Sequence, residues 1–84
     1  MFTVKLSKKT LKDLARLNES GLFGNFAELI SVLRQDPYTP PFEKLLGDYK
    51  GYCSRRINVQ HRLVYKVNDE TKSVYVVSAW THYE

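Results

Sequence analysis

Apolar and polar residues alternate at the start of the chain and then change to a helical spacing. Residues 2–6 show the period of a short strand with one buried face. Ser7 is a preferred helix N-cap residue, and Leu11, Leu14 and Ala15 follow it at the spacing of one helix face. The other side of this helix carries the charged residues Lys8, Lys9, Lys12, Asp13 and Arg16. We expect the helix to end near residues 18–21.

A second helical pattern begins at Gly24 or Asn25. Apolar residues recur at positions 26, 29, 30 and 33, and Glu28 and Arg34 stand near the ends where their charges suit the helix dipole. The residue before a proline is disfavoured in the helical region, so Pro37 predicts the end of this helix.

The second half of the chain is typical of an antiparallel meander. Residues 42–45 predict a short edge strand, and longer strand patterns cover residues 52–58, 62–68 and 73–80. Short connections between sequential strands favour antiparallel pairing. We therefore predict one α+β domain over residues 1–84, with two N-terminal helices packed on one face of a mostly antiparallel sheet of four to five strands.

Strand alternation indicates which side chains share a face of this sheet. Positions 63, 65 and 67 point to one face, whereas Arg62 and Lys66 point to the other. The helices must cover the apolar face, so Arg62 and Lys66 are expected on the uncovered one. In the preceding strand Cys53 suits the core, which places Arg56 beside Arg62.

Positive charge is concentrated in this part of the chain. Thirteen Lys and Arg residues against nine Asp and Glu residues give a net charge of +4. Between Lys44 and Lys66, six cations accompany a single carboxylate, that of Asp48. Such a segment indicates an acidic partner, either nucleic acid or a negatively charged protein segment, although a solvated basic face accounts equally well for the charge alone.

Composition excludes several classes of site. One cysteine, Cys53, rules out an internal disulfide and a thiolate metal cluster within the chain, and the two histidines lack a metal-ligand spacing, so we predict no metal or cofactor. Cys53 is typical of a small packing residue. No apolar run approaches membrane-spanning length, and residues 1–5 lack the apolar region of a signal peptide. We expect a cytoplasmic protein with no membrane partner.

Several motifs together resemble those of one family, the YoeB/Txe toxins of the RelE-type toxin–antitoxin superfamily. The motifs are Gly51-Tyr52-Cys53-Ser54-Arg55-Arg56-Ile57, His61-Arg62-Leu63-Val64-Tyr65 and the terminal His82-Tyr83. The similarity extends over nearly the whole chain. It implies a RelE-like microbial ribonuclease fold and a type II toxin that cleaves mRNA in the A site of the 70S ribosome. It also implies a cognate YefM/Axe-like antitoxin as partner. The sequence leaves the oligomeric state open, with a homodimer as one alternative.

The resemblance implies roles for individual residues. Glu43 matches the general base, His82 the general acid and Tyr83 the terminal aromatic residue, while Arg62 and Arg56 match arginines that contact the scissile phosphate. Metal-independent attack by the RNA 2′-hydroxyl needs a base, an acid and a cation, and these residue types supply them. The other basic residues expected to bind RNA are Arg55, Lys50 and Lys44.

Three positions depart from the family pattern. Leu46 stands where family members often carry a lysine, so Lys44 or Lys50 has to supply that charge. Cys53 stands where tryptophan is frequent. Glu84 follows Tyr83 and adds negative charge beside the expected site.

The pattern alone leaves other interpretations open. Glu43 also suits a solvent-facing strand edge, Arg56 and Arg62 suit outward strand residues that oppose aggregation, and His82 suits a frayed terminus. Two interpretations apply to Tyr49, Tyr52 and Trp80: stacking on unpaired RNA bases, and packing in the core or at an interface. The rival functions are a non-enzymatic RelE/ParE-like toxin that binds another target, such as gyrase, and a plain interaction module.

Overall fold

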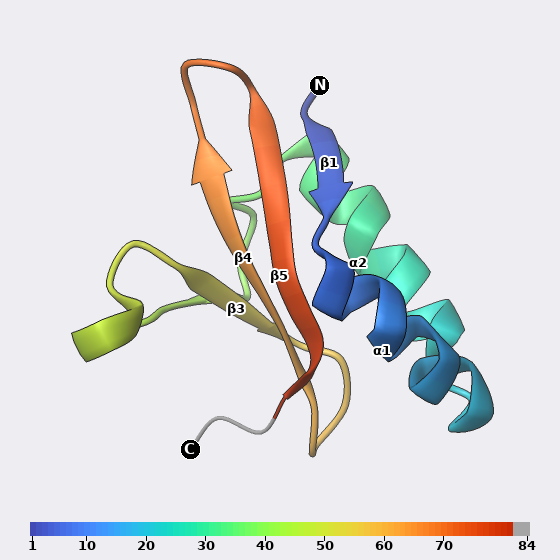
Figure 1. Ribbon diagram of the computed structural model, residues 1–84. Coiled ribbons are helices and arrows are strands. Elements are labelled where there is room, and N and C mark those ends of the chain that lie inside the picture. Colours follow the sequence, from blue (N-terminus) through green and yellow to red (C-terminus); the bar gives the residue numbers. More distant parts are fainter. Residues whose placement is uncertain (82–84) are drawn as a thin grey trace.

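The computed structural model describes residues 1–81 and consists of a sheet covered on one face by two helices (Figure 1). The elements, in chain order, are β1 (Thr3–Leu6), α1 (Lys8–Glu19), α2 (Phe23–Gln35), β2 (Glu43–Lys44), the 3-10 turn η1 (Gly47–Tyr49), β3 (Cys53–Arg56), β4 (Arg62–Asn68) and β5 (Ser73–Thr81). The strand order is β1-β5-β4-β3-β2. β1 pairs with β5 in parallel, and the other neighbours are antiparallel. The predicted fold class is confirmed.

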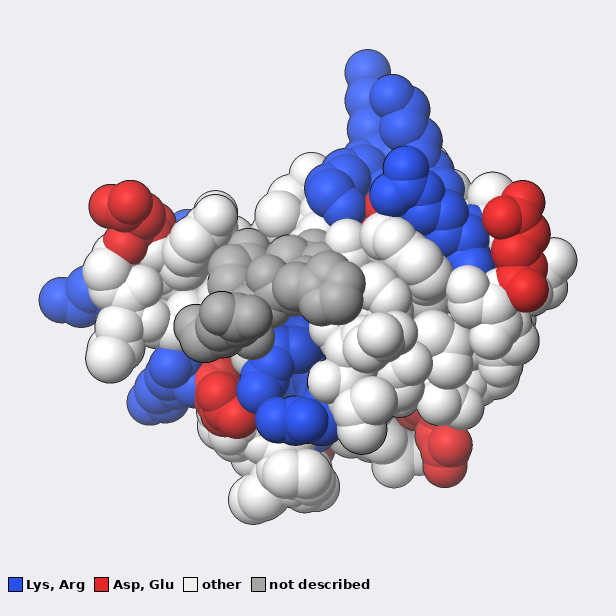
Figure 2. Space-filling model, turned by 90° about the horizontal axis from the view of Figure 1, so that it is seen from below, with Lys and Arg blue, Asp and Glu red and all other residues white. Residues whose placement is uncertain are grey.

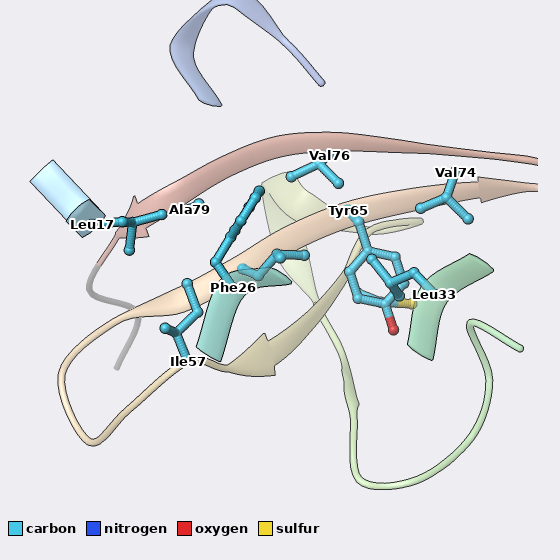
Figure 3. Packing of buried hydrophobic residues seen from close by; sticks show 10 residues of the cluster. Leu17, Phe26, Leu33, Ile57, Tyr65, Val74, Val76 and Ala79 are labelled. Carbon is cyan, nitrogen blue, oxygen red and sulfur yellow. The ribbon is translucent and has the colours of Figure 1, made fainter. Parts of the chain in front are cut away.

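The hydrophobic core lies between the helices and the face of the sheet that they cover. Leu17 of α1 and Phe26 and Leu33 of α2 are buried against side chains of β4 and β5, among them Tyr65 and Val76 (Figure 3). Full burial of an apolar side chain stabilises a fold by about 1.5–3 kcal/mol. α2 therefore buries the face that its periodicity predicts.

α1 buries a different face from the one that its apolar residues suggest. Leu11 is 54% exposed and Ala15 is also exposed, whereas Thr10, Asp13 and Leu17 are buried. The prediction that Asp13 lies on the solvent side of this helix is wrong. The reason is that α1 packs on β5 partly through polar side chains, which apolar periodicity does not detect.

These polar side chains cover an edge of β5 that β1 leaves without a strand neighbour. β1 is short, and its pairing with β5 ends at Leu6 and Val76. Ser7, which caps α1 as predicted, donates from Oγ to the Val77 carbonyl at 2.7 Å. Thr10 donates from Oγ1 to the Val76 carbonyl at 3.0 Å. The helix thus satisfies backbone groups that an exposed strand edge leaves unpaired.

Asp13 extends this contact further along β5. Its carboxylate accepts a hydrogen bond from the Ala79 N–H at 3.0 Å, and Lys9 Nζ lies 2.8 Å from the same carboxylate. A buried carboxylate is tolerated when hydrogen bonds and an opposite charge compensate for its desolvation. Asp13 therefore attaches α1 to the last part of β5.

The face opposite the helices, here called the open face, carries two rows of side chains important for function. The strand register places the first row across β2, β3, β4 and β5, with the residues Glu43, Ser54, Val64 and Ser78. In the next row Arg56 pairs with Arg62, so the prediction that they share this face is confirmed. Val64 is only 1% exposed, which means that the middle of the open face is closed to solvent.

Candidate functional site

Glu43 and Arg62 form an ion pair on the open face. Arg62 Nη2 lies 3.2 Å from Glu43 Oε1, and Arg62 Nη1 donates to Ser54 Oγ, also at 3.2 Å. The Arg62 side chain is 14% exposed, whereas that of Glu43 is 63% exposed. The strands therefore hold the guanidinium in a fixed position, and the carboxylate remains accessible at the sheet edge.

Two hollows give solvent access to this pair. The first, of about 440 Å³, is lined by Glu43 and Arg62 and, from η1, by Tyr49. The second, of about 350 Å³, lies between α2, the connection of residues 39–42 and β3, and Arg56 contributes to its wall. Of the residues expected to bind phosphate, Arg62 and Arg56 are thus brought together with Glu43.

Lys44 and Lys50 are exposed, as RNA-binding residues must be, but they lie to one side of the ion pair. Lys44 pairs with Cys53, which faces the core, so its side chain leaves β2 on the side opposite to that of Glu43. Both lysines line a neighbouring hollow of about 400 Å³ together with Tyr52, and Lys44 also lines the hollow that contains Glu43 and Arg62. Leu46, at the family lysine position, is 83% exposed and lines the hollow that contains Glu43.

The expectation that Arg55 binds RNA does not agree with its position. Arg55 is 3% exposed and points to the helix side of the sheet. Its guanidinium donates to the Pro37 carbonyl at 2.8 Å, to the Pro41 carbonyl at 3.1 Å and to the Tyr65 hydroxyl at 3.1 Å. It also lies 5.5 Å from the centroid of the Phe42 ring. Arg55 therefore fixes the connection that leads to Glu43, and its guanidinium is engaged in these internal hydrogen bonds although the residue lines the 350 Å³ hollow.

Burial determines the protonation of the two ionisable groups next to this arginine. Desolvation raises the pKa of the Tyr65 phenol to about 12, although the Arg55 charge opposes the shift. The Tyr65 hydroxyl stays protonated and donates to the Pro37 carbonyl at 3.0 Å. Desolvation also raises the pKa of the Cys53 thiol. Cys53 is therefore a packing residue, as predicted, rather than a nucleophile.

Ser54 is a site residue that the sequence analysis did not single out. It is fully buried beside Arg62 and accepts one of the arginine's hydrogen bonds. The available signal was the alternation of β3, which puts Ser54 on the same face as Arg56. A small polar residue inside a strand does not indicate a site until the register shows which side chains lie beside it.

His61 and Trp80 pack against each other rather than lining the hollows around Glu43. Their rings are stacked with centroids 3.8 Å apart, and His61 is 5% exposed. His82 and Tyr83, expected to be the general acid and the terminal aromatic residue, lie outside the residues that the structure describes.

Basic side chains form several separate groups at the end of the molecule seen in Figure 2, and acidic side chains lie against some of them. On the face shown, the largest blue projection lies apart from the central group. Within residues 1–81, no helix is long and apolar enough to cross a membrane.

Comparison with known proteins gives a consistent result. A family model described as a YoeB-like toxin of a bacterial type II toxin–antitoxin system matches residues 6–83. Toxin YoeB of Streptomyces coelicolor is 44% identical over 57 residues, which is 66% of each chain. Toxin YoeB of Mycobacterium bovis is 33% identical over 86 aligned positions, covering 99% of this chain and 84% of its own.

Solved structures agree over nearly the full length. A YoeB/ParE toxin from Agrobacterium tumefaciens has a TM-score of 0.86 and 26% identity, covering 98% of this chain and all of its own. The YoeB–YefM heterotetramer from Staphylococcus aureus has a TM-score of 0.80 at 27% identity and 99% coverage of both chains. A YoeB dimer from the same organism has a TM-score of 0.81 at 28% identity and 98% coverage of both chains.

Proposed function

The chain belongs to the YoeB-like toxins of bacterial type II toxin–antitoxin systems, and from this premise we propose that it is a ribosome-dependent endoribonuclease. It cleaves mRNA in the ribosomal A site and thereby inhibits translation. The observation that carries this proposal is the pairing of an accessible carboxylate, Glu43, with a fixed guanidinium, Arg62, on the open face. A base and a phosphate-binding cation within contact of each other are what transesterification of RNA needs.

In this mechanism Glu43 removes the proton from the 2′-hydroxyl, which then attacks the adjacent phosphorus. Arg62 binds the phosphate oxygens and stabilises the negative charge that develops on them, and Arg56 adds a second guanidinium from the neighbouring strand. His82 protonates the leaving 5′-oxygen, and Tyr83 contacts the adjacent base. The products are a 2′,3′-cyclic or 3′-phosphate and a 5′-hydroxyl end.

The contact of Glu43 with Arg62 suits an enzyme before its substrate binds. Arg62 is held by Ser54 as well as by Glu43, whereas the Glu43 side chain is mostly exposed. An incoming phosphate competes for the guanidinium and frees the carboxylate to accept a proton. Ser54 keeps Arg62 in place during this exchange, so it acts as a positioning residue.

The decisive experiment uses translating ribosomes, a defined message and primer extension. We expect Glu43→Gln to reduce cleavage about 10²-fold or more, the usual loss for a general base. Glu28→Gln, which changes an exposed glutamate of α2 on the helix side of the sheet, is the matched control and retains cleavage. Full activity of Glu43→Gln excludes Glu43 as the base. His82→Ala tests the acid in the same assay.

Charge at the site must be separated from charge in general. Arg62→Ala removes the guanidinium from the ion pair, and Lys12→Ala removes an exposed cation from α1, on the helix side of the sheet. We expect cleavage to be lost in the first variant and kept in the second. Equal losses from both variants indicate a diffuse electrostatic effect instead of a phosphate site.

A YefM/Axe-like antitoxin is the proposed protein partner, because the related toxin of Staphylococcus aureus was solved in complex with YefM. An acidic segment that folds on binding suits the basic open face. A homodimer is also proposed, since a YoeB dimer is known from the same organism. Co-expression with a YefM-type antitoxin, followed by light scattering of the purified complex and the free toxin, tests both assemblies.

A further inference from the structure

A third row of side chains crosses the open face beyond the ion pair, and it alternates cations with aromatic rings. Lys5 of β1 pairs with Tyr75 of β5, and Tyr75 pairs with Lys66 of β4. Lys66 Nζ lies 5.5 Å from the centroid of the Tyr52 ring, which precedes β3. The neighbours of Tyr75 along β5, Val74 and Val76, are fully buried in the core, so Tyr75 points to the open face. We call these four residues, Lys5, Tyr75, Lys66 and Tyr52, the Lys–Tyr row.

The row is accessible and has no evident packing role on this face. Tyr75 is 49% exposed although β5 lies between β1 and β4 in the sheet. Lys5 and Lys66 are exposed on either side of it. Within residues 1–81, neither lysine has an acidic partner in an ion pair. The row therefore presents an open ring between two ammonium groups.

We propose that the Lys–Tyr row binds the single-stranded RNA that flanks the cleaved bond, with Tyr75 stacking on a base and Lys66 contacting a phosphate. Interleaved aromatic and cationic side chains on a sheet are the usual means of holding single-stranded nucleic acid without base-specific hydrogen bonds. The inference rests on the proposed function, because Arg62 fixes the scissile phosphate. It extends the site by a subsite some distance from the reacting atoms.

The distance along β4 suits such a subsite. Arg62 and Lys66 are on the same strand and face, four residues apart, which corresponds to about 13 Å at the rise of an antiparallel strand. A strand of RNA bound at Arg62 therefore reaches the row within a few nucleotides, passing around the buried Val64, which lies between Arg62 and Lys66 on the same face. The row ends near the β4–β5 turn, where Asp69 and Glu70 carry negative charge. The RNA track accordingly stops at the row and does not continue over the turn.

RNA length provides a direct test. Fluorescence anisotropy measures the affinity of the purified full chain for 2′-O-methyl oligoribonucleotides, which cannot be cleaved, of about three and about nine nucleotides. We expect Tyr75→Ala to weaken binding of the longer strand by about five-fold or more, the low end of base–aromatic stacking, and to weaken binding of the shorter strand by less. Tyr75→Phe keeps the ring and retains the affinity, and circular dichroism verifies the fold of each variant.

Salt dependence separates the roles of the two residues. Lys66→Gln should reduce the slope of log affinity against log salt for the longer strand by about 0.7, the value for one phosphate contact on a single strand. Tyr75→Ala should lower the affinity with the slope unchanged. Lys12→Gln, on the helix side, is the control for a lysine outside the track and should alter neither quantity.

Other results overturn the inference in distinguishable ways. The row is not an RNA subsite if both strands bind the unchanged chain with equal affinity, or if Tyr75→Ala and Lys66→Gln bind the longer strand normally. In either case, ribosomal cleavage by the unchanged chain still supports the proposed function. If the same two variants bind RNA normally but lose affinity for the antitoxin, the row is a protein-docking surface and the RNA assignment is wrong. Absence of cleavage on ribosomes removes the proposed function itself.

Discussion

Two adjacent arginines of β3 are expected to respond very differently to the same substitution. Arg55 is 3% exposed and hydrogen-bonded on the helix side, whereas Arg56 is exposed on the open face. Arg55→Met removes three hydrogen bonds from a charged group, each with a net value of about 1.5–3 kcal/mol. The Pro37 carbonyl keeps its bond from the Tyr65 hydroxyl, and methionine retains part of the apolar packing.

From these terms we expect Arg55→Met to lower the free energy of unfolding by about 3 kcal/mol. This is less than the low end of the hydrogen-bond sum, about 4.5 kcal/mol, because the retained Tyr65 bond and the methionine packing compensate for part of the loss. In a domain of this size that corresponds to a fall in Tm of about 12–24 °C. Arg56→Met, with the same change in side chain, is expected to stay within about 0.5 kcal/mol of the unchanged protein.

Urea denaturation followed by circular dichroism measures both variants, and ribosomal cleavage is assayed at a temperature where both are folded. The expected pattern is that Arg55→Met loses stability and Arg56→Met loses cleavage. A result in which Arg55→Met is as stable as Arg56→Met refutes the reasoning, because it means that the buried guanidinium contributes nothing net to the fold.

Three further predictions follow from buried polar and ionisable groups. Asp13→Ala leaves the Ala79 N–H without its acceptor and should lower the free energy of unfolding by about 1–3 kcal/mol in urea denaturation. Lys9→Ala should lower it by less than about 1 kcal/mol, because the Lys9 side chain is half exposed. The pKa of Tyr65 is raised from 10.0 to about 12, so the stabilisation from its neutral phenol is complete below pH 10 and is lost as the pH rises through about 12. The unfolding free energy of Tyr65→Phe should therefore fall less over that pH range than that of the unchanged protein. Identical alkaline profiles of the two proteins would contradict the assignment. The raised pKa and burial of Cys53 predict slow modification by a thiol reagent in the native protein and rapid modification in urea, and fast native labelling would contradict this.

The sequence predicts the elements of this fold well, because each carries a clear period or terminator. The helix cap at Ser7, the stop at Pro37 and the alternation of β4 depend on local physics that the tertiary structure does not override. The side of α1 that is buried is not predictable in the same way. Its contact with β5 runs through Thr10 and Asp13, and polar residues on a helix are ordinarily assigned to solvent.

The candidate site is predictable only in part for a similar reason. Alternation identifies Arg56 and Arg62 as neighbours on the open face, and the family resemblance adds Glu43. Their contact depends on register, which sequence alone does not provide. The position of Arg55 differs from the expectation because a basic residue in a basic segment suggests a ligand, whereas its bonds to proline carbonyls arise from a connection distant in the sequence.

Two extra residues in β5 shift its register against β4, and strand alternation in the sequence does not reveal which side chains of β5 face the site. Tyr65 pairs with Val76 and Val64 with Ser78, so Val77 is an extra residue in β5, and another lies between Ser78 and Thr81. Without the first bulge, Ser78 would face the helices and Ala79 the open face. With it, Ala79 enters the core, where its N–H reaches Asp13. α1 carries no candidate site residue, yet through this bond it fixes the part of β5 from which the chain continues to His82 and Tyr83. The position of the last part of β5 is therefore set by the packing of a helix on the far side of the sheet.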